Sequence, residues 1–246
     1  MLDKVPEPRL TGSPDHPSTR SPDHPITESP GAFCLPRLYA IIDPAQSEGR
    51  SPVEVAEDLL AAGVRLIQLR DKRASPRGLY ETARQLAALV RSAGGLFVVN
   101  DRADIALAAD ADGVHVGQDD LPVESARQVV GRGKLVGFST HNPEQVREAD
   151  RSTADYVAFG PIYSTTSKAN PDPLVGLEGL ARARTLTRKP LVAIGGITLE
   201  NVRPVLEAGA DSMAIIRGLV GAKDIAQRAR AFLSMLHFSK AENGQG

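Results

Sequence analysis

Short apolar runs alternate with longer amphipathic segments along most of this chain. Eight runs rich in Leu, Ile, Val and Ala predict β-strands at residues 38–42, 66–69, 96–99, 113–116, 135–138, 156–159, 191–194 and 212–216. Most segments between them carry apolar residues at helical spacing, as at Leu79, Ala83, Leu86 and Val90. Strands that alternate with helices in this way predict an α/β fold with a parallel sheet.

Polar or glycine-rich residues follow nearly every predicted strand. In a (β/α)8 TIM barrel the carboxyl ends of all strands meet at one face, where the loops build the active site. In an open, doubly wound sheet the site would instead lie at one switch point. Because polar and charged residues follow nearly every predicted strand, we predict a single-domain (β/α)8 TIM barrel. About 200 residues is the lower size limit for this fold.

Both ends of the chain depart from this pattern. Residues 1–36 contain eight of the 18 prolines, and the sequence Ser-Pro-Asp-His-Pro at residues 13–17 is repeated at residues 21–25. Such a segment buries little apolar surface, so we predict that residues 1–36 are a disordered N-terminal extension. The catalytic barrel is predicted to span residues 37–238, and residues 239–246 to form a flexible tail.

Composition and charge argue against a nucleic-acid-binding, membrane or disulfide-bonded protein. The formal net charge is −1, so nothing suggests attraction to nucleic acid or to a membrane surface. No apolar run approaches the roughly 20 residues that a membrane-spanning helix needs. The single cysteine, Cys34, cannot form an intrachain disulfide and fits a reducing compartment. We expect a cytoplasmic protein that acts on small molecules, and the sequence leaves open whether it forms a homo-oligomer.

Gln68, Arg70 and Lys72 lie at the end of the second predicted strand. Alternation along the strand places Gln68 and Arg70 on one face, with Lys72 just beyond. Arg can bind a phosphate or diphosphate through two parallel hydrogen bonds, and Lys can bind it as a point charge. These residues are therefore candidates for an anion site; the alternative is an ordinary salt-bridged loop.

Acidic residues follow the third and fourth predicted strands. Adjacent strand ends can bring Asp101 and Asp120 together, and Asp119 is a weaker candidate than its neighbour. Two carboxylates, with water and substrate phosphate oxygens, are the usual surroundings of Mg²⁺. The alternative is that these acids only cap helices. No set of His and Cys residues has the spacing of a zinc site.

Ser139, His141 and His115 are further polar candidates. A hydroxyl and an imidazole this close in sequence do not make a catalytic triad, and no orienting acid is evident. We expect Ser139 to donate a hydrogen bond to a substrate oxygen. His115 lies between two valines of the fourth strand and is expected to be a buried barrel residue.

A second anion site is predicted after the last three strands. A hydroxyl-rich loop follows the sixth strand, two glycines follow the seventh, and the loops after strands seven and eight are the common phosphate site of such barrels. The candidate residues of this second site are Thr165, Ser167, Lys168, Gly196, Ile216 and Arg217.

Taken together in order and spacing, these motifs resemble the thiamine-phosphate synthase family over about residues 38–237. The motifs that carry the resemblance are Gln68-Leu-Arg-Asp-Lys72, Asn100-Asp-Arg102, Asp112-Gly-Val-His-Val-Gly-Gln-Asp-Asp120, Ser139-Thr-His141, Gly160-Pro161 through Lys168, and Ala193-Ile-Gly-Gly-Ile197. The resemblance implies a (β/α)8 barrel that couples 4-amino-2-methyl-5-pyrimidinylmethyl diphosphate to a thiazole phosphate, with release of diphosphate.

The resemblance also implies a role for each matching residue. The pyrimidine diphosphate would be bound by Gln68, Arg70, Lys72 and Asn100, with Ser139 and Lys168 on the diphosphate side. The thiazole phosphate would be bound by Thr165, Ser167 and Gly196, with Ile216 and Arg217 at the last strand end. Asp101 and Asp120 would hold Mg²⁺, and Lys72 and Lys168 would be the catalytic cations.

The mechanism that the family implies is dissociative. Diphosphate leaves to give a pyrimidine-stabilised carbocation, which the thiazole nitrogen attacks, so the protein supplies positioning and charge stabilisation rather than a nucleophile. The chain departs from the family pattern at two positions. Ser167 stands where Thr is usual, and Arg217 stands where a small residue is usual, which affects the thiazole-phosphate pocket more than the reaction.

Two alternatives remain at this point. A paralogous thiazole tautomerase has the same fold, and there His141 would transfer the proton. That isomerase would not need a diphosphate and metal site, so the joint presence of Lys72, Asn100, Asp101 and Asp120 argues against it. The other alternative is a non-catalytic, phosphate-sensing barrel, for which Arg217 is the only support.

Overall fold

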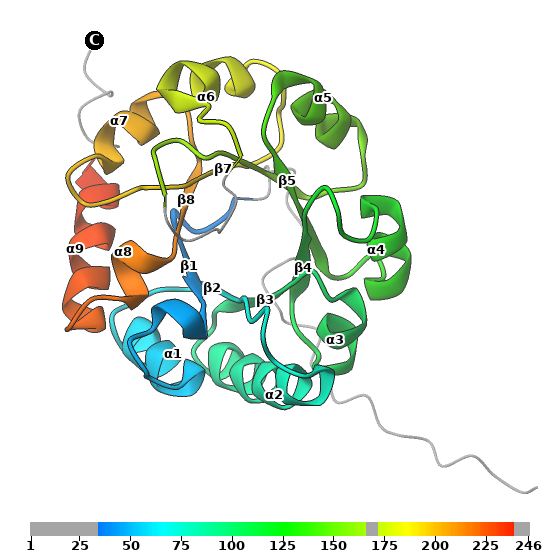
Figure 1. Ribbon diagram of the computed structural model, residues 1–246, viewed down its shortest axis with the longest axis vertical. Coiled ribbons are helices and arrows are strands. Elements are labelled where there is room, and N and C mark those ends of the chain that lie inside the picture. Colours follow the sequence, from blue (N-terminus) through cyan, green and yellow to red (C-terminus); the bar gives the residue numbers. More distant parts are fainter. Residues whose placement is uncertain (1–33, 166–171, 239–246) are drawn as a thin grey trace, which may run out of the picture. The chain divides into compact units, whose positions relative to one another are not determined.

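The structure is a computed structural model that describes residues 34–165 and 172–238. Its strands form one closed parallel barrel in sequence order, and β1 pairs with β8 to close it. The strands are β1 (Leu38–Ile42), β2 (Leu66–Leu69), β3 (Leu96–Asn100), β4 (Gly113–Val116), β5 (Leu135–Thr140), β6 (Tyr156–Phe159), β7 (Leu191–Ile194) and β8 (Ser212–Ile215). Helices surround the barrel as an outer ring (Figure 1). The predicted TIM barrel is confirmed.

Helices connect successive strands on the outside of the barrel. They are α1 (Pro52–Ala61), α2 (Pro76–Ser92), α3 (Ala103–Ala108), α4 (Val123–Val130), α5 (Pro143–Arg151), α6 (Gly176–Arg184), α7 (Val202–Glu207), α8 (Arg217–Val220) and α9 (Ile225–Phe238), with a 3-10 turn at Pro44–Gln46. Ser75 caps α2 by accepting a hydrogen bond from the Gly78 N–H at 3.1 Å, as its position before Pro76 predicts.

The boundaries of several elements differ from those that the sequence predicts. β5 continues to Thr140 because Ser139 and Thr140 still pair with Ala158 and Phe159 of β6. β3 likewise extends to Asn100, which pairs with His115. The four-residue helix α8 is absent from the sequence prediction because so short a segment shows no helical periodicity.

The apolar core has two parts. The larger lies between the outer face of the strands and the helices, as amphipathic helices on a parallel sheet require. The smaller fills the barrel interior and contains Leu35, Tyr39, Ile41, Leu66, Val98, Tyr156, Ala158, Val192 and Ala214. Leu35 belongs to the segment predicted as an extension, yet it is 6% exposed. The next residue, Pro36, accepts a hydrogen bond from the Ser212 hydroxyl at 2.7 Å.

The rest of the predicted extension, residues 1–33, and the predicted tail, residues 239–246, lie outside the described part of the chain. Within the described residues, no helix is both long enough and apolar enough to cross a membrane.

Candidate active site

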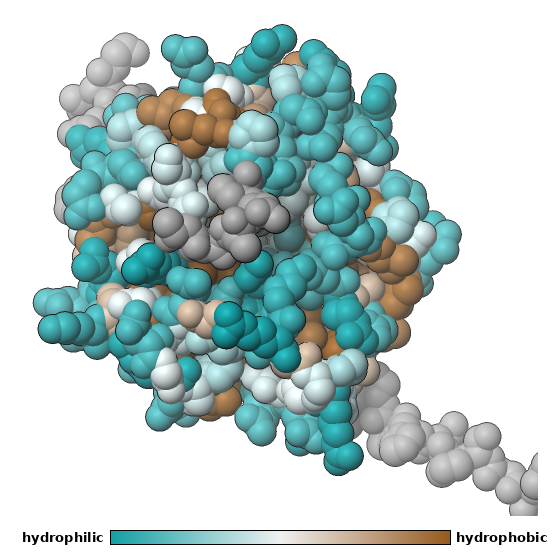
Figure 2. Space-filling view, in the orientation of Figure 1, coloured by the Kyte–Doolittle hydropathy of each residue, from teal (hydrophilic) through white to brown (hydrophobic). Residues whose placement is uncertain are grey.

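A cavity of about 1130 Å³ opens at the carboxyl ends of the strands. This volume exceeds that of a usual small-molecule pocket and suits two ligands. Figure 2 shows that the surface in this view is mainly hydrophilic, with apolar residues in scattered patches. The predicted site residues that line the cavity are Gln68, Arg70, Lys72, Asn100, Asp101, Asp120, Ser139, Thr165, Gly196, Ile216 and Arg217. Ser167 and Lys168 lie outside the described residues.

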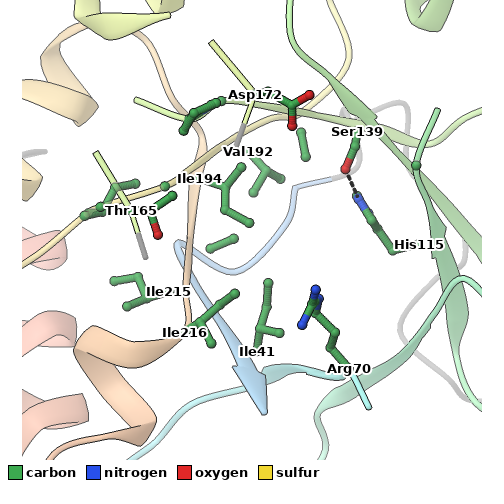
Figure 3. A pocket seen from close by; sticks show the side chains of 18 of the residues that line it. Ile41, Arg70, His115, Ser139, Thr165, Asp172, Val192, Ile194, Ile215 and Ile216 are labelled. Atoms are coloured by element: carbon green, nitrogen blue, oxygen red, sulfur yellow. Dashed lines mark hydrogen bonds between the residues drawn. The ribbon is translucent and has the colours of Figure 1, made fainter. Parts of the chain in front are cut away.

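The two predicted regions of the site occupy different parts of the cavity. In Figure 3, Arg70 lies on one side, and Thr165 and Asp172 lie across from it. Ile41 and Ile216 lie between Arg70 and Thr165 in the view. Both of these isoleucines belong to, or pack against, the apolar core inside the barrel. The arrangement therefore separates two polar regions by an apolar floor.

Lys72, Asp101 and Asp120 form a cluster across the ends of β2, β3 and β4. The Lys72 ammonium donates a hydrogen bond to an Asp101 carboxylate oxygen. The Asp101 carboxyl group also interacts with the neighbouring Asp120 carboxyl group. Burial, and then the neighbouring Asp120, raise the pKa of Asp101 above its ordinary value. One Asp120 oxygen also accepts the Gly117 N–H at 2.8 Å, which fixes the carboxylate.

The backbone of Asp101 is itself unusual. Its φ angle is +63°, in the left-handed region that few non-glycine residues adopt. The Asp101 N–H donates to the His115 carbonyl at 2.7 Å, so pairing with β4 holds this conformation. Strained backbone that the surrounding structure holds in place is frequent at functional sites.

The donor set of this cluster fits a hard divalent cation. Lys72 pairs with Asp101, but the neighbouring Asp120 still raises the pKa of that carboxyl group, and a bound Mg²⁺ would relieve the repulsion between the two carboxylates. Within the described residues, no three His, Cys, Asp or Glu side chains gather as a complete metal site. A cation here would therefore depend on water and substrate oxygens for the rest of its shell, which is the usual condition of Mg²⁺ at phosphate sites.

Arg70 is held by a residue that the sequence analysis missed. Asp43 follows β1, is 3% exposed, and forms an ion pair with the Arg70 guanidinium. The other Asp43 carboxylate oxygen accepts the Ala45 N–H at 3.0 Å. Asp43 directly follows a strand, as Asp101 does, so the signal that identified Asp101 would also have identified Asp43.

Gly195 and Gly196 follow β7 and line the cavity. Their φ angles are +103° and +63°, and a Cβ on Gly196 would lie 2.5 Å from the Ser164 carbonyl oxygen. Glycine is therefore required both by the backbone conformation and by space. Two cations from the last helices, Arg217 of α8 and Arg228 of α9, also line the cavity. The arrangement suits an anionic group.

Ser139 and His141 do not act as a nucleophile–base pair. The Ser139 hydroxyl lies 2.8 Å from His115 Nε2. His141 Nδ1 instead lies 2.7 Å from the Gly160 carbonyl oxygen, and its Nε2 is 3.4 Å from an Asp172 oxygen. His115 is 7% exposed, so the prediction of a buried barrel residue is confirmed.

Comparisons with known proteins agree with this geometry. The family model described as thiamine monophosphate synthase matches residues 38–219. A thiamine-phosphate synthase of Koribacter versatilis is 53% identical over 82% of this chain and 97% of its own length. One of Syntrophomonas wolfei is 45% identical, covering 78% of this chain and 92% of its own length.

A solved structure supports the same assignment. The thiamine phosphate pyrophosphorylase of Pyrococcus furiosus superposes with a TM-score of 0.76 at 35% identity, over 82% of this chain and 96% of that one. The family model matches most of the chain, and the relatives match it over nearly their full length. The chain therefore belongs to the thiamine monophosphate synthase family.

Proposed function

We propose that this chain is a transferase that condenses 4-amino-2-methyl-5-pyrimidinylmethyl diphosphate with a thiazole phosphate to give thiamine phosphate and diphosphate. The observation that carries the proposal is the meeting of Lys72, Asp101 and Asp120 in the same cavity as Gly196. One region offers cations and carboxylates for a metal-bound diphosphate, and the other offers a glycine cradle for a phosphate.

The chain's own groups stabilise the leaving diphosphate. Arg70 and Lys72 each contact one carboxylate, and both line the cavity. Their charges are placed before the reaction, so the protein does not reorganise as negative charge develops on the leaving group. Lys168, outside the described residues, is proposed as a third cation on this side.

Mg²⁺, held by Asp101 and Asp120, would neutralise the diphosphate and favour its departure. Asn100 lines the cavity beside these acids and is proposed to contact the same substrate. Gln68 and Ser139 are proposed to orient the pyrimidine, with Ser139 on the diphosphate side. These roles require no nucleophile from the protein, because the thiazole nitrogen attacks the carbocation itself.

The thiazole phosphate is proposed to lie in the second region. Thr165, Gly196, Ile216 and Arg217 line it, and Ser167 is proposed to complete it. Arg217 would add a cation where the family usually has a small residue. Holding both substrates across one apolar floor converts an encounter in solution into a reaction between oriented groups.

The synthase is favoured over the two alternatives. An isomerase that relies on His141 gives no reason for the Lys72, Asp101 and Asp120 cluster, which suits a metal-bound diphosphate. A phosphate-sensing barrel gives no reason for it either. A cytoplasmic location and a possible homo-oligomer remain proposals that follow from the sequence.

The test is an assay of the purified protein with Mg²⁺ and three substrate mixtures: both substrates, the pyrimidine diphosphate alone, and the thiazole phosphate carboxylate alone. The proposal predicts thiamine phosphate and equimolar diphosphate only in the first mixture. Isomerisation of the thiazole without any coupling would instead identify a tautomerase, and binding without turnover would identify a sensor.

A further inference from the structure

A chain of hydrogen bonds crosses the barrel beneath the cavity. Gln68 Nε2 donates to the Tyr39 hydroxyl at 2.6 Å, and that hydroxyl lies 2.8 Å from the Tyr156 hydroxyl. The Tyr156 hydroxyl lies 3.1 Å from His115 Nδ1, and His115 Nε2 lies 2.8 Å from the Ser139 hydroxyl. The chain thus joins Gln68 to Ser139 through three buried side chains of β1, β6 and β4, and of these three only Tyr156 does not line the cavity.

One direction gives every hydroxyl proton within the chain an acceptor. The Gln68 amide nitrogen donates to Tyr39, and the Tyr39 proton has an acceptor in the chain only if it goes to Tyr156. Tyr156 in turn has one proton, which goes to His115 Nδ1. The imidazole then carries its proton on Nε2 and donates it to Ser139. Ser139 accepts within the chain, and its own proton is left for an acceptor in the cavity.

Burial supports this assignment. Tyr39 is 1% exposed and Tyr156 is 0% exposed. Burial raises the pKa of both phenols above its ordinary value. Both phenols therefore keep their protons and remain donors. The rings pack as well as bond, since the Tyr156 and His115 rings stack with centroids 5.5 Å apart.

Gly137 of β5 leaves the space that this chain occupies. A Cβ at Gly137 would lie 2.1 Å from Tyr156 Cζ and 2.4 Å from His115 Nδ1. Any side chain at this position would therefore push apart the two groups whose hydrogen bond sets the His115 tautomer. The hydrogen-bond chain therefore requires glycine at position 137.

We infer that Tyr39, Tyr156 and His115 are positioning residues that fix Ser139 as a hydrogen-bond donor toward the substrate. They act through Ser139; Tyr39 and His115 also line the cavity, whereas Tyr156 lies outside its lining. The effect on turnover rests on the proposed function, whereas the direction of the hydrogen bonds does not. Because each link polarises the next, loss of one link weakens the donor at the end.

The direction of the chain is tested directly by ¹⁵N NMR of the full protein labelled at histidine. His115 is assigned from the signals that disappear in a His115→Gln variant. The inference predicts a neutral ring with its proton on Nε2 and with an unprotonated Nδ1. A proton on Nδ1 would overturn it, whatever reaction the protein performs.

The positioning role is tested by a double-mutant cycle on turnover. Tyr156→Phe is expected to lower kcat/KM about tenfold, the effect of one lost hydrogen bond. In a Ser139→Ala background the same substitution should have little further effect, because its influence passes through the missing hydroxyl. Additive losses would show a merely structural role and would contradict the inference.

Tyrosine-to-phenylalanine substitutions at two other positions serve as a control and as an alternative. Tyr80→Phe removes a hydroxyl from α2, away from the cavity, and should leave kcat/KM unchanged. Tyr39→Phe breaks the first link and serves if Tyr156→Phe does not fold. If the wild-type protein makes no thiamine phosphate, the proposed function fails while the NMR result still decides the direction of the chain.

Discussion

Asp43 and Arg70 form an ion pair between the residue that follows β1 and the residue that follows β2. Asp43 is almost fully buried, and the Arg70 N–H donates to the Ile42 carbonyl at 2.9 Å, so strand pairing fixes both ends. A carboxylate that holds a guanidinium in this way limits the directions in which its other N–H groups can point. In Figure 3 the Arg70 side chain extends toward the cavity that it lines.

Replacement of Asp43 should therefore damage substrate binding without direct contact with substrate. Asp43→Asn keeps the acceptor for Ala45 but removes the charge opposite Arg70. We expect kcat/KM for the pyrimidine diphosphate to fall about 10- to 100-fold, as for other residues that orient a ligand-binding group. Steady-state kinetics with each substrate varied in turn measures this effect.

The matched control is Glu81→Gln, which removes the carboxylate of an exposed ion pair with Arg77. Exposed pairs contribute little, so this variant should behave as wild type. A normal KM for the pyrimidine diphosphate in Asp43→Asn would show that Arg70 needs no partner.

Most of the fold could be predicted from the local sequence pattern, because short apolar runs indicate buried strands and amphipathic segments indicate helices that pack on one face. All eight strands were placed within two residues of their bounds. α8 could not be predicted because its four residues form no periodic pattern.

The site residues that could be predicted are those whose charge and position after a strand indicate a function without knowledge of their neighbours in space. Asp101 and Lys72 reveal an anion or metal site by charge and position. The Tyr39–Tyr156 contact joins residues 117 positions apart in sequence, so it depends on barrel closure and cannot be seen in either strand by itself.

Gly196 provides a test of the second anion region. Gly196→Ala forces a side chain into a positive φ and against the Ser164 carbonyl oxygen. We expect the KM for the thiazole phosphate to rise at least about tenfold, because the loop must shift from the phosphate. The KM for the pyrimidine diphosphate should change much less.

Gly94→Ala is the control for backbone strain. Gly94 has a similar φ of +68°, but no atom lies within 4 Å of the added Cβ. Both variants should lose about 1 kcal/mol of stability from the left-handed backbone. Only Gly196→Ala should alter thiazole-phosphate binding, and equal kinetic effects would remove this assignment.

Asp150 links stability to pH. Its carboxylate accepts the Thr187 hydroxyl at 2.7 Å and the Arg188 N–H at 3.1 Å, and the bond from Thr187 is the main cause that lowers its pKa. A lowered pKa in the folded state stabilises the protein above the unfolded value of about 3.9. This contribution is lost as the pH falls through the folded value.

Asp150→Asn should therefore destabilise the protein by about 1 kcal/mol at neutral pH. The difference in free energy of unfolding between this variant and wild type should shrink as the pH drops below about 4. Urea unfolding over a series of pH values measures both quantities. Glu57→Gln, at an exposed position of α1, is the control; a constant difference for Asp150→Asn at every pH would refute the linkage.

The proposed reaction depends on the Lys72, Asp101 and Asp120 cluster, which is expected to support Mg²⁺-dependent release of diphosphate. The most direct measurement is thiamine phosphate formation by wild type and by Asp101→Ala as Mg²⁺ is varied. Asp104→Ala serves as control, since Asp104 is exposed, pairs with Arg102 and lies outside the cavity lining. Wild type and Asp104→Ala should form thiamine phosphate, whereas Asp101→Ala should lose about a hundredfold or more of the rate. A normal rate and normal Mg²⁺ dependence in Asp101→Ala would contradict this expectation.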